Sequence, residues 1–363
     1  MQAFWFGTIA VLWAGFFLLE GFDFGVGMLL PLVARTEPER RVAVRSIGPF
    51  WDGNEVWLIV AGGATFAAFP EWYASVFSGF YLAFALLLVG LILRGIGIEY
   101  RGKADTALGR RWCDACIVTG SSLAALLLGV AFADFLRGVS MDAGHNMTDG
   151  FFALLTPYAL LGGLVTLSLF AFHGATFLVL RTEGPVAERA RRLSRMLGPG
   201  AGGLAVVFLL WTTQVRGGAV SLVLALCIVI ALAGAVRAAR VGRQTVAFAA
   251  SSVAAALVPV WTFAALWPDV LPARNDAALS LTVYNASSSP YTLNVMTVVA
   301  LLFVPIVLAY QAWTYWVFRA RVTGEIAVGD GYGSLAPIVA KARESARETL
   351  GRSSVTEPPH SGP

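Results

Sequence analysis

The feature that most constrains this 363-residue sequence is a series of long apolar stretches joined by short polar connections. Hydrophobic residues make up 57% of the chain and charged residues only 13%, a balance typical of membrane proteins. A helix needs about 20 apolar residues to cross the hydrocarbon core of a bilayer. Nine stretches meet this need, at residues 4–33, 50–69, 75–98, 113–135, 153–180, 197–215, 218–236, 245–267 and 292–318. The sequence therefore predicts an all-α polytopic membrane protein with about nine transmembrane helices.

Positive charges predict how these helices are oriented, because lysine and arginine beside membrane spans are retained on the cytoplasmic side. All but three of the 26 lysines and arginines lie in or beside alternate connections or after the last stretch; the exceptions are Arg137, Arg216 and Arg274. We therefore expect the N-terminus outside and the C-terminus in the cytoplasm, which requires an odd number of spans. The net charge of +4 lies in short loops beside the membrane, so it predicts lipid headgroups as partners and not nucleic acid.

The chain divides into one membrane domain, residues 1–320, and a cytoplasmic tail, residues 321–363. A short helix is predicted in the tail at 334–350. The end that follows it is rich in Ser, Pro and Gly and is expected to be disordered.

A weak internal symmetry relates two regions of the membrane domain. The first and fifth apolar stretches are both long, and each carries a polar residue followed by glycine, Glu20-Gly21 and His173-Gly174. The symmetry predicts two four-helix bundles, residues 1–137 and 150–267, plus one peripheral helix at 292–318.

Acidic side chains interrupt the first two apolar stretches. A carboxylate in hydrocarbon is costly unless it faces the bundle interior, water or a partner charge, so each such acid is a candidate site. Residues three or four apart share a helix face, which pairs Glu20 with Asp23 and Asp52 with Glu55 and leaves Asn54 on a different side. Both pairs are expected in the cytoplasmic half of the membrane, with Asp52 nearest the water.

Two acid pairs on sequential helices suggest a proton relay that starts at the cytoplasm. One alternative is that hydrogen bonds from Asn54, Trp57 and backbone carbonyls satisfy the acids, which then only stabilise the bundle. Another is a proton-coupled secondary transporter, since buried acids and glycine-interrupted helices also suit alternating access. Against the transporter, the weak repeat relates spans of the same orientation, and no stretch carries paired Gly and Pro at mid-depth.

Two further patterns are interpreted as structural. Gly21 and Gly25 are four residues apart, a spacing that lets another helix approach closely and would press it against Asp23. Arg94 and Glu99, near the inner end of the third stretch, are interpreted as an interfacial pair whose charged groups reach toward water.

Histidines and cysteines limit what cofactors the chain can hold. His173 is the only histidine within an apolar stretch, so two histidines of this chain cannot hold a membrane b-type haem. A lone membrane histidine is more often a polar packing residue, and a single axial ligand from His173 or Met28 is the minor alternative. Cys113 and Cys116 have no second ligand pair near them and are interpreted as small packing residues. No metal site is predicted.

Three longer motifs carry a resemblance to a known family. They are Gly-Phe-Asp-Phe-Gly-Val-Gly at Gly21 to Gly27, Trp-Asp-Gly-Asn-Glu-Val-Trp-Leu-Ile at Trp51 to Ile59, and Phe-Ala-Ala-Phe-Pro at Phe66 to Pro70. Further matches lie at 174–176, 280–282, 285–288 and 292–297, and at Pro305, Tyr310, Trp313 and Tyr315. With these motifs the sequence resembles subunit II of the cytochrome bd-type quinol oxidases.

The resemblance implies a multi-pass protein of the bacterial plasma membrane that works in a complex. A sister subunit I would hold haem b and haem d, and the complex would oxidise membrane quinol and reduce oxygen to water. Small accessory subunits are further candidate partners. This chain would have no haem and no oxidase activity of its own, and it would bind subunit I and help to supply protons from the cytoplasm.

The resemblance also carries roles over to individual residues. Asp52 would lie at the cytoplasmic proton entrance and Asp23 would follow it. Glu20 and Glu55 are added to the pathway because helical spacing pairs them with Asp23 and Asp52. A structural quinone near aromatic residues makes Trp57 a candidate contact. Asn54 and His173 are further supporting polar positions, and His173 matches no requirement of the family.

Overall fold

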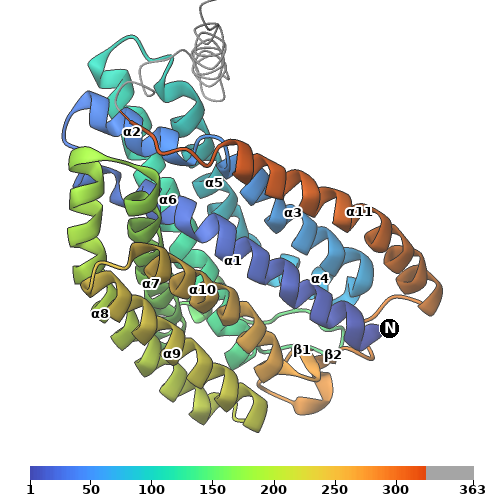
Figure 1. Cartoon of the computed structure of the whole chain (residues 1–363). Helices are drawn as coiled ribbons and strands as arrows, with labels where there is room; N and C mark the ends of the chain where they lie inside the picture. Colours follow the sequence, from blue (N-terminus) through green and yellow to red (C-terminus); the bar gives the residue numbers. More distant parts are fainter. Residues whose placement is uncertain (324–363) are drawn as a thin grey trace, which may run out of the picture.

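The computed structural model describes residues 1–323, so the predicted tail helix at 334–350 and nearly all of the tail lie outside the described residues. The described helices are α1 Gln2–Val33, α2 Glu37–Ile47, α3 Trp51–Ala68, α4 Pro70–Gly79, α5 Tyr81–Arg101, α6 Ala107–Arg137, α7 Pro157–Arg181, α8 Gly184–Val215, α9 Ala219–Arg240, α10 Gln244–Leu266 and α11 Pro290–Val317. Two 3-10 turns, η1 Phe151–Leu154 and η2 Ala277–Leu279, and two short antiparallel strands, β1 Asp269–Leu271 and β2 Leu281–Thr282, complete the described region. Figure 1 shows α2 at one end of the helical bundle and the strands at the opposite end.

The predicted all-α membrane architecture is confirmed. Eight of the described helices, α1 and α5 to α11, are long and apolar enough to cross a bilayer. The remaining expected span, 50–69, forms α3, which falls outside that group because Asp52, Asn54 and Glu55 lie in its first two turns. Figure 1 shows α3 running between α1 and α11, alongside both.

Helix boundaries differ from the predicted stretches where helices extend or break. The stretch 75–98 is divided at Phe80, where α4 ends and α5 begins. The residues between the first two stretches form α2, whose start is stabilised when the Glu39 carboxylate accepts the Thr36 backbone N–H at 3.1 Å. α8 begins at Gly184, well before the predicted start at residue 197. Its first turns are charged and were not part of the apolar stretch, but they are helical as well.

α1 occupies the centre of the bundle and contacts α3, α6, α7 and α10. Every residue from Glu20 to Gly27 is buried. At its crossing with α7 the backbones touch: a Cβ added at Gly25 would overlap the carbonyl oxygen of Phe170, and one at Gly174 would overlap the backbone of Gly25. Gly21 lies one turn earlier against the Phe170 ring. The glycines therefore bring α7 against the segment of α1 that carries the acids.

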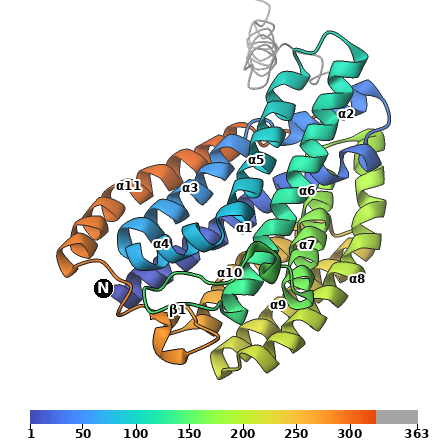
Figure 2. The same cartoon turned by 180° about the vertical axis from the view of Figure 1, so that it is seen from behind.

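α11 lies at the edge of the molecule, as Figures 1 and 2 show. Among its residues only Leu293 is buried. The described region therefore has a peripheral helix where the stretch 292–318 predicted one. The repeat relation between 1–137 and 150–267 stays a prediction.

Candidate functional site

Four charged side chains from three helices meet inside the bundle. Glu20 and Asp23 come from α1, Glu55 from α3 and Arg94 from α5. Glu20, Asp23 and Arg94 have no exposed surface, and the Glu55 side chain is 22% exposed. Arg94 forms an ion pair with Glu20, and its Nη1 lies 3.6 Å from Glu55 Oε2. We call Glu20, Asp23, Glu55 and Arg94 the acid cluster.

The acid cluster holds more carboxyl groups than cations. One guanidinium faces three carboxyl groups, so ionising all three would leave buried charge uncompensated, at several kcal/mol per ion. Five of its buried polar atoms find no hydrogen-bond partner among the described residues: Glu20 Oε2, Asp23 Oδ1, Glu55 Oε2, Arg94 Nε and Arg94 Nη2. Buried polar atoms of this kind are rare in proteins and point to a functional arrangement.

Asn54 connects the acid cluster to the peripheral helix. Its side-chain amide donates to Asp23 Oδ2 at 2.7 Å and to the Leu19 carbonyl at 3.3 Å. Its side-chain oxygen accepts from Gln311 Nε2 at 3.1 Å and from the Tyr315 hydroxyl at 2.9 Å. Asn54 was expected on a different side of its helix from Asp52 and Glu55. It is nevertheless the residue of α3 that bonds Asp23 directly.

Trp57 does not contact a carboxyl group. Its indole N–H donates to Gln311 Oε1 at 2.8 Å, which corrects the alternative in which Trp57 satisfies the acids. Gln311 and Tyr315 were missed as site residues by sequence reasoning, because polar groups near the end of an apolar helix are common. Two signals were available: a glutamine in a largely apolar stretch, and the place of Tyr315 among the residues that carry the family resemblance.

Asp52 lies in the first turn of α3 and is exposed. Glu55 follows one turn deeper, and the two carboxyl groups interact electrostatically. Asp52, Glu55 and the buried Glu20 and Asp23 therefore form a series that runs from the surface near α2 into the bundle.

Arg94 is placed differently from the interfacial pair predicted for it with Glu99. It is fully buried, bonds Glu20 and packs over the rings of Phe24 and Trp51, with centroid distances of 4.8 Å and 5.7 Å. The carboxyl groups of Glu20 and Glu55 stabilise the Arg94 guanidinium inside the bundle, so the side chain does not extend to the membrane surface. A single arginine in the apolar run Leu-Ile-Leu-Arg-Gly-Ile was the signal, since an ionisable residue at that depth is itself a site candidate.

His173 joins three helices. Its Nε2–H donates to the Leu18 carbonyl of α1 at 3.1 Å, because a carbonyl oxygen can only accept, and Nδ1 lies 2.8 Å from Ser251 Oγ of α10. The ring also stacks on Phe248. With both nitrogens engaged by protein groups, His173 does not fit the role of a haem ligand. Among residues 1–323, no group of three or more His, Cys, Asp or Glu is placed to hold a metal ion.

A network of ion pairs joins α2 to α5, α6 and α8. Arg101 donates to both oxygens of Glu37 at 3.0 and 2.9 Å and to Asp114 at 2.6 Å. Arg189 of α8 donates to both oxygens of Glu39, at 2.8 and 3.1 Å. The hydrogen bonds from Arg189, with those from the backbone N–H groups of Arg35 and Thr36, lower the pKa of Glu39 from 4.5 to about 2.

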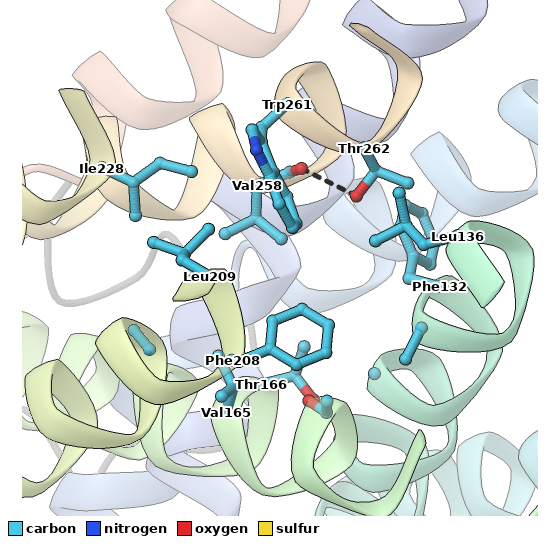
Figure 3. Close-up of a pocket in the computed structure, with 14 residues that line it drawn as sticks. Phe132, Leu136, Val165, Thr166, Phe208, Leu209, Ile228, Val258, Trp261 and Thr262 are labelled. Carbon is cyan, nitrogen blue, oxygen red and sulfur yellow. Dashed lines mark hydrogen bonds between the residues drawn. The ribbon is translucent and has the colours of Figure 1, made fainter. Parts of the chain in front are cut away.

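Apolar cavities lie away from the acid cluster. One, of about 410 Å³, is lined by aromatic residues including Trp13, Phe66, Tyr73, Phe77 and Phe84. A smaller one of about 30 Å³ lies among α6 to α10, where Figure 3 shows Phe132, Phe208, Trp261 and Thr262 around it. Its lining contains no titratable group, so it is a packing gap and does not belong to the candidate site.

Comparison with known proteins identifies relatives along most of the chain. The family model for cytochrome bd terminal oxidase subunit II matches residues 1–318. Cytochrome bd ubiquinol oxidase subunit 2 of Bacillus subtilis (strain 168) is 40% identical over 331 residues, which cover 88% of this chain and 96% of the relative. Cytochrome bd-I ubiquinol oxidase subunit 2 of Escherichia coli (strain K12) is 36% identical over 370 residues, covering 88% and 95%.

The fold is also similar to a solved structure. A chain of the bd oxidase from Geobacillus thermodenitrificans superposes with a TM-score of 0.69 at 15% identity, covering 87% of this chain and 98% of that one. At this identity the likeness concerns the fold alone, and the family follows from the sequence matches. This chain belongs to the cytochrome bd terminal oxidase subunit II family.

Proposed function

We propose that this chain is the haem-free subunit of a complex that oxidises membrane quinol and reduces oxygen to water, and that it carries protons from the cytoplasm toward the oxygen site. Family membership makes it a component of an oxidoreductase complex and a multi-pass protein of the bacterial plasma membrane. The observation that carries the proton role is the acid cluster, with three carboxyl groups around one buried guanidinium.

The proposed path begins at Asp52, exposed at the end of the bundle where α2 lies. Protons pass to Glu55 and then to the carboxyl groups of Glu20 and Asp23. Since Arg94 cannot balance all three carboxyl groups, the acid cluster can hold a proton, and its oxygens without a hydrogen-bond partner are positions where a proton can be accepted. The end with α2 is cytoplasmic in this proposal, as the distribution of arginines predicts.

Subunit I is proposed to bind the face formed by α3 and α11. Ile59 on α3 and Leu301 on α11 are each 70% exposed, and most of α11 is uncovered. Gln311 and Tyr315 connect this face to Asp23 through Asn54. These hydrogen bonds would connect the acid cluster to a partner docked there.

Haem b and haem d are assigned to subunit I in this proposal. The only histidine of the described membrane helices, His173, has both nitrogens bonded within the chain. A structural quinone fits the aromatic cavity of about 410 Å³ better than the neighbourhood of Trp57, which does not line that cavity. Accessory subunits remain candidates without a site of their own.

Replacing Asp52 by Asn in the assembled complex tests the path. We expect the haem spectrum to be unchanged and oxygen consumption to fall by about tenfold or more, since one protonatable group is lost. The matched control is Glu71→Gln, on α4 and remote from the acid cluster. Unchanged turnover would instead favour a purely structural role for the acids, and loss of haem would indicate a role in assembly.

The transporter alternative gains no support from the family assignment. It predicts solute movement by the isolated chain in vesicles, whereas the oxidase proposal predicts none.

A further inference from the structure

A groove of about 500 Å³ lies between α8 and α9. Figures 1 and 2 show these helices on the side of the bundle away from α3 and α11, so the groove is separate from the proposed docking face. The two helices touch at Gly198, where an added Cβ would lie 3.0 Å from Val236. One turn further along α8, a Cβ added at Gly202 would meet no atom within 4 Å, so the space beside Gly202 is open.

The groove runs from a charged end into the apolar region. Its α8 side extends from Gly198 to Val206, eight residues or about 12 Å along a helix axis. Val229, Leu232 and Val236 form much of its α9 side. This length and this lining match a segment of an acyl chain lying along the helices.

Two arginines mark the other end of the groove. Arg237 and Arg240 line it from the last turn of α9, and both are exposed. Neither makes an ion pair or a side-chain hydrogen bond within residues 1–323. Arg195 of α8 donates to the Ala239 carbonyl at 3.3 Å and so ties the two helices together at this end. The helix dipole of α9 favours positive charge in its last turn, but it does not account for an apolar groove beneath that charge.

We propose that this groove binds one anionic phospholipid, with its phosphate on Arg237 and Arg240 and an acyl chain along Gly202 toward Val206. Guanidinium groups bind phosphate oxygens through paired N–H donors, and arginines near a membrane surface attract anionic lipids. The site does not depend on the proposed proton path, since it shares no residue with the acid cluster.

Native mass spectrometry of the purified, delipidated complex tests the proposal. The complex is titrated with phosphatidylglycerol or with phosphatidylcholine of the same acyl chains. We expect one phosphatidylglycerol to bind about tenfold more tightly than phosphatidylcholine, as two arginines near an anionic headgroup would produce. The Arg237→Gln/Arg240→Gln double variant should lose this preference. Gly202→Leu, which fills the groove, should weaken binding of both lipids.

Matched variants separate the groove from general surface charge. Arg191→Gln/Arg192→Gln removes two exposed arginines of α8 that do not line the groove, and Gly203→Leu adds the same side chain into open space beside it. Both controls should bind like the wild type.

Equal phosphatidylglycerol binding by the Arg237/Arg240 variant and the wild type would overturn the proposal, as would equal losses in the variants and their controls. If Gly202→Leu does not fold, the arginine variants alone decide. If the purified complex showed no haem absorption band, that result would contradict the proposed function. The lipid titration would still test the groove, because lipid binding is measured by mass and does not depend on haem.

Discussion

Arg94 determines the charge of the acid cluster. It is the single cation among three buried or nearly buried carboxyl groups, and its contact with Glu20 is completely shielded from solvent. A buried ion pair need not stabilise a protein relative to apolar residues, but removing one partner strands the other as an uncompensated charge.

Arg94→Ala should therefore destabilise the chain by about 3–5 kcal/mol. The measurement is the unfolding free energy of the detergent-solubilised complex. The Arg94→Ala/Glu20→Gln double variant should recover some of that loss, because no unpaired Glu20 charge remains. A single variant as stable as the wild type would show that other groups compensate Glu20.

The acids could be predicted from the sequence, whereas their true partners could not. Glu20, Asp23, Asp52 and Glu55 stand out individually because a carboxyl group in an apolar stretch is rare. Arg94, the partner of Glu20 and Glu55, lies 74 residues after Glu20 and 39 after Glu55. The packing of α5 against its neighbours turns that side chain inward, and no local pattern encodes this direction.

At the scale of helices, the crossing of α1 and α7 positions the acids. Gly25 contacts the α7 backbone directly, so the space for a side chain is absent there. The sequence predicted close packing at Gly21 and Gly25 from their spacing, but it could not identify α7 as the partner, since many helices carry small residues.

Gly25→Ala should force α1 and α7 apart and cost about 1–3 kcal/mol, as overpacking does. The matched control is Gly7→Ala on the same helix, where an added Cβ meets no atom within 4 Å. Alanine is the better helix former, so the control should be neutral or slightly stabilising. Thermal unfolding of both variants in detergent makes the comparison. Equal effects at the two positions would contradict the close approach at Gly25.

The connection between α2 and α8 should depend on pH. Hydrogen bonds from Arg189 hold the pKa of Glu39 at about 2 in the folded chain, below its ordinary value of 4.5. Because the folded pKa is the lower one, the contribution of Glu39 is complete above about pH 4.5 and is lost as the pH falls toward 2. The difference in thermal midpoint between wild type and Glu39→Gln should therefore shrink over this interval. Glu188→Gln, an exposed neighbour of Arg189, should show no comparable trend.

At the scale of the whole molecule, α3 and α11 form an apolar side that the described residues leave uncovered. The sequence predicted the number and class of the spans because each needs only local hydropathy. It could not predict which face stays uncovered, since that depends on how α11 packs. With only Leu293 of α11 buried, the side formed by α3 and α11 is apolar, uncovered and connected to Asp23 through Asn54.

Bulky substitutions can distinguish a subunit interface from a surface that faces only lipid. Fluid acyl chains accommodate a tryptophan, but a packed protein interface cannot without moving the partner. Ile59→Trp on α3 should therefore reduce the haem absorbance that co-purifies with this chain, while Leu226→Trp, 59% exposed on α9, should leave it unchanged. The measured quantity is haem absorbance per mole of this chain after affinity purification. If Ile59→Trp retains all of its haem and Leu226→Trp loses it, subunit I docks on the side of α9, and the proposed proton path would then have to cross the bundle to reach it.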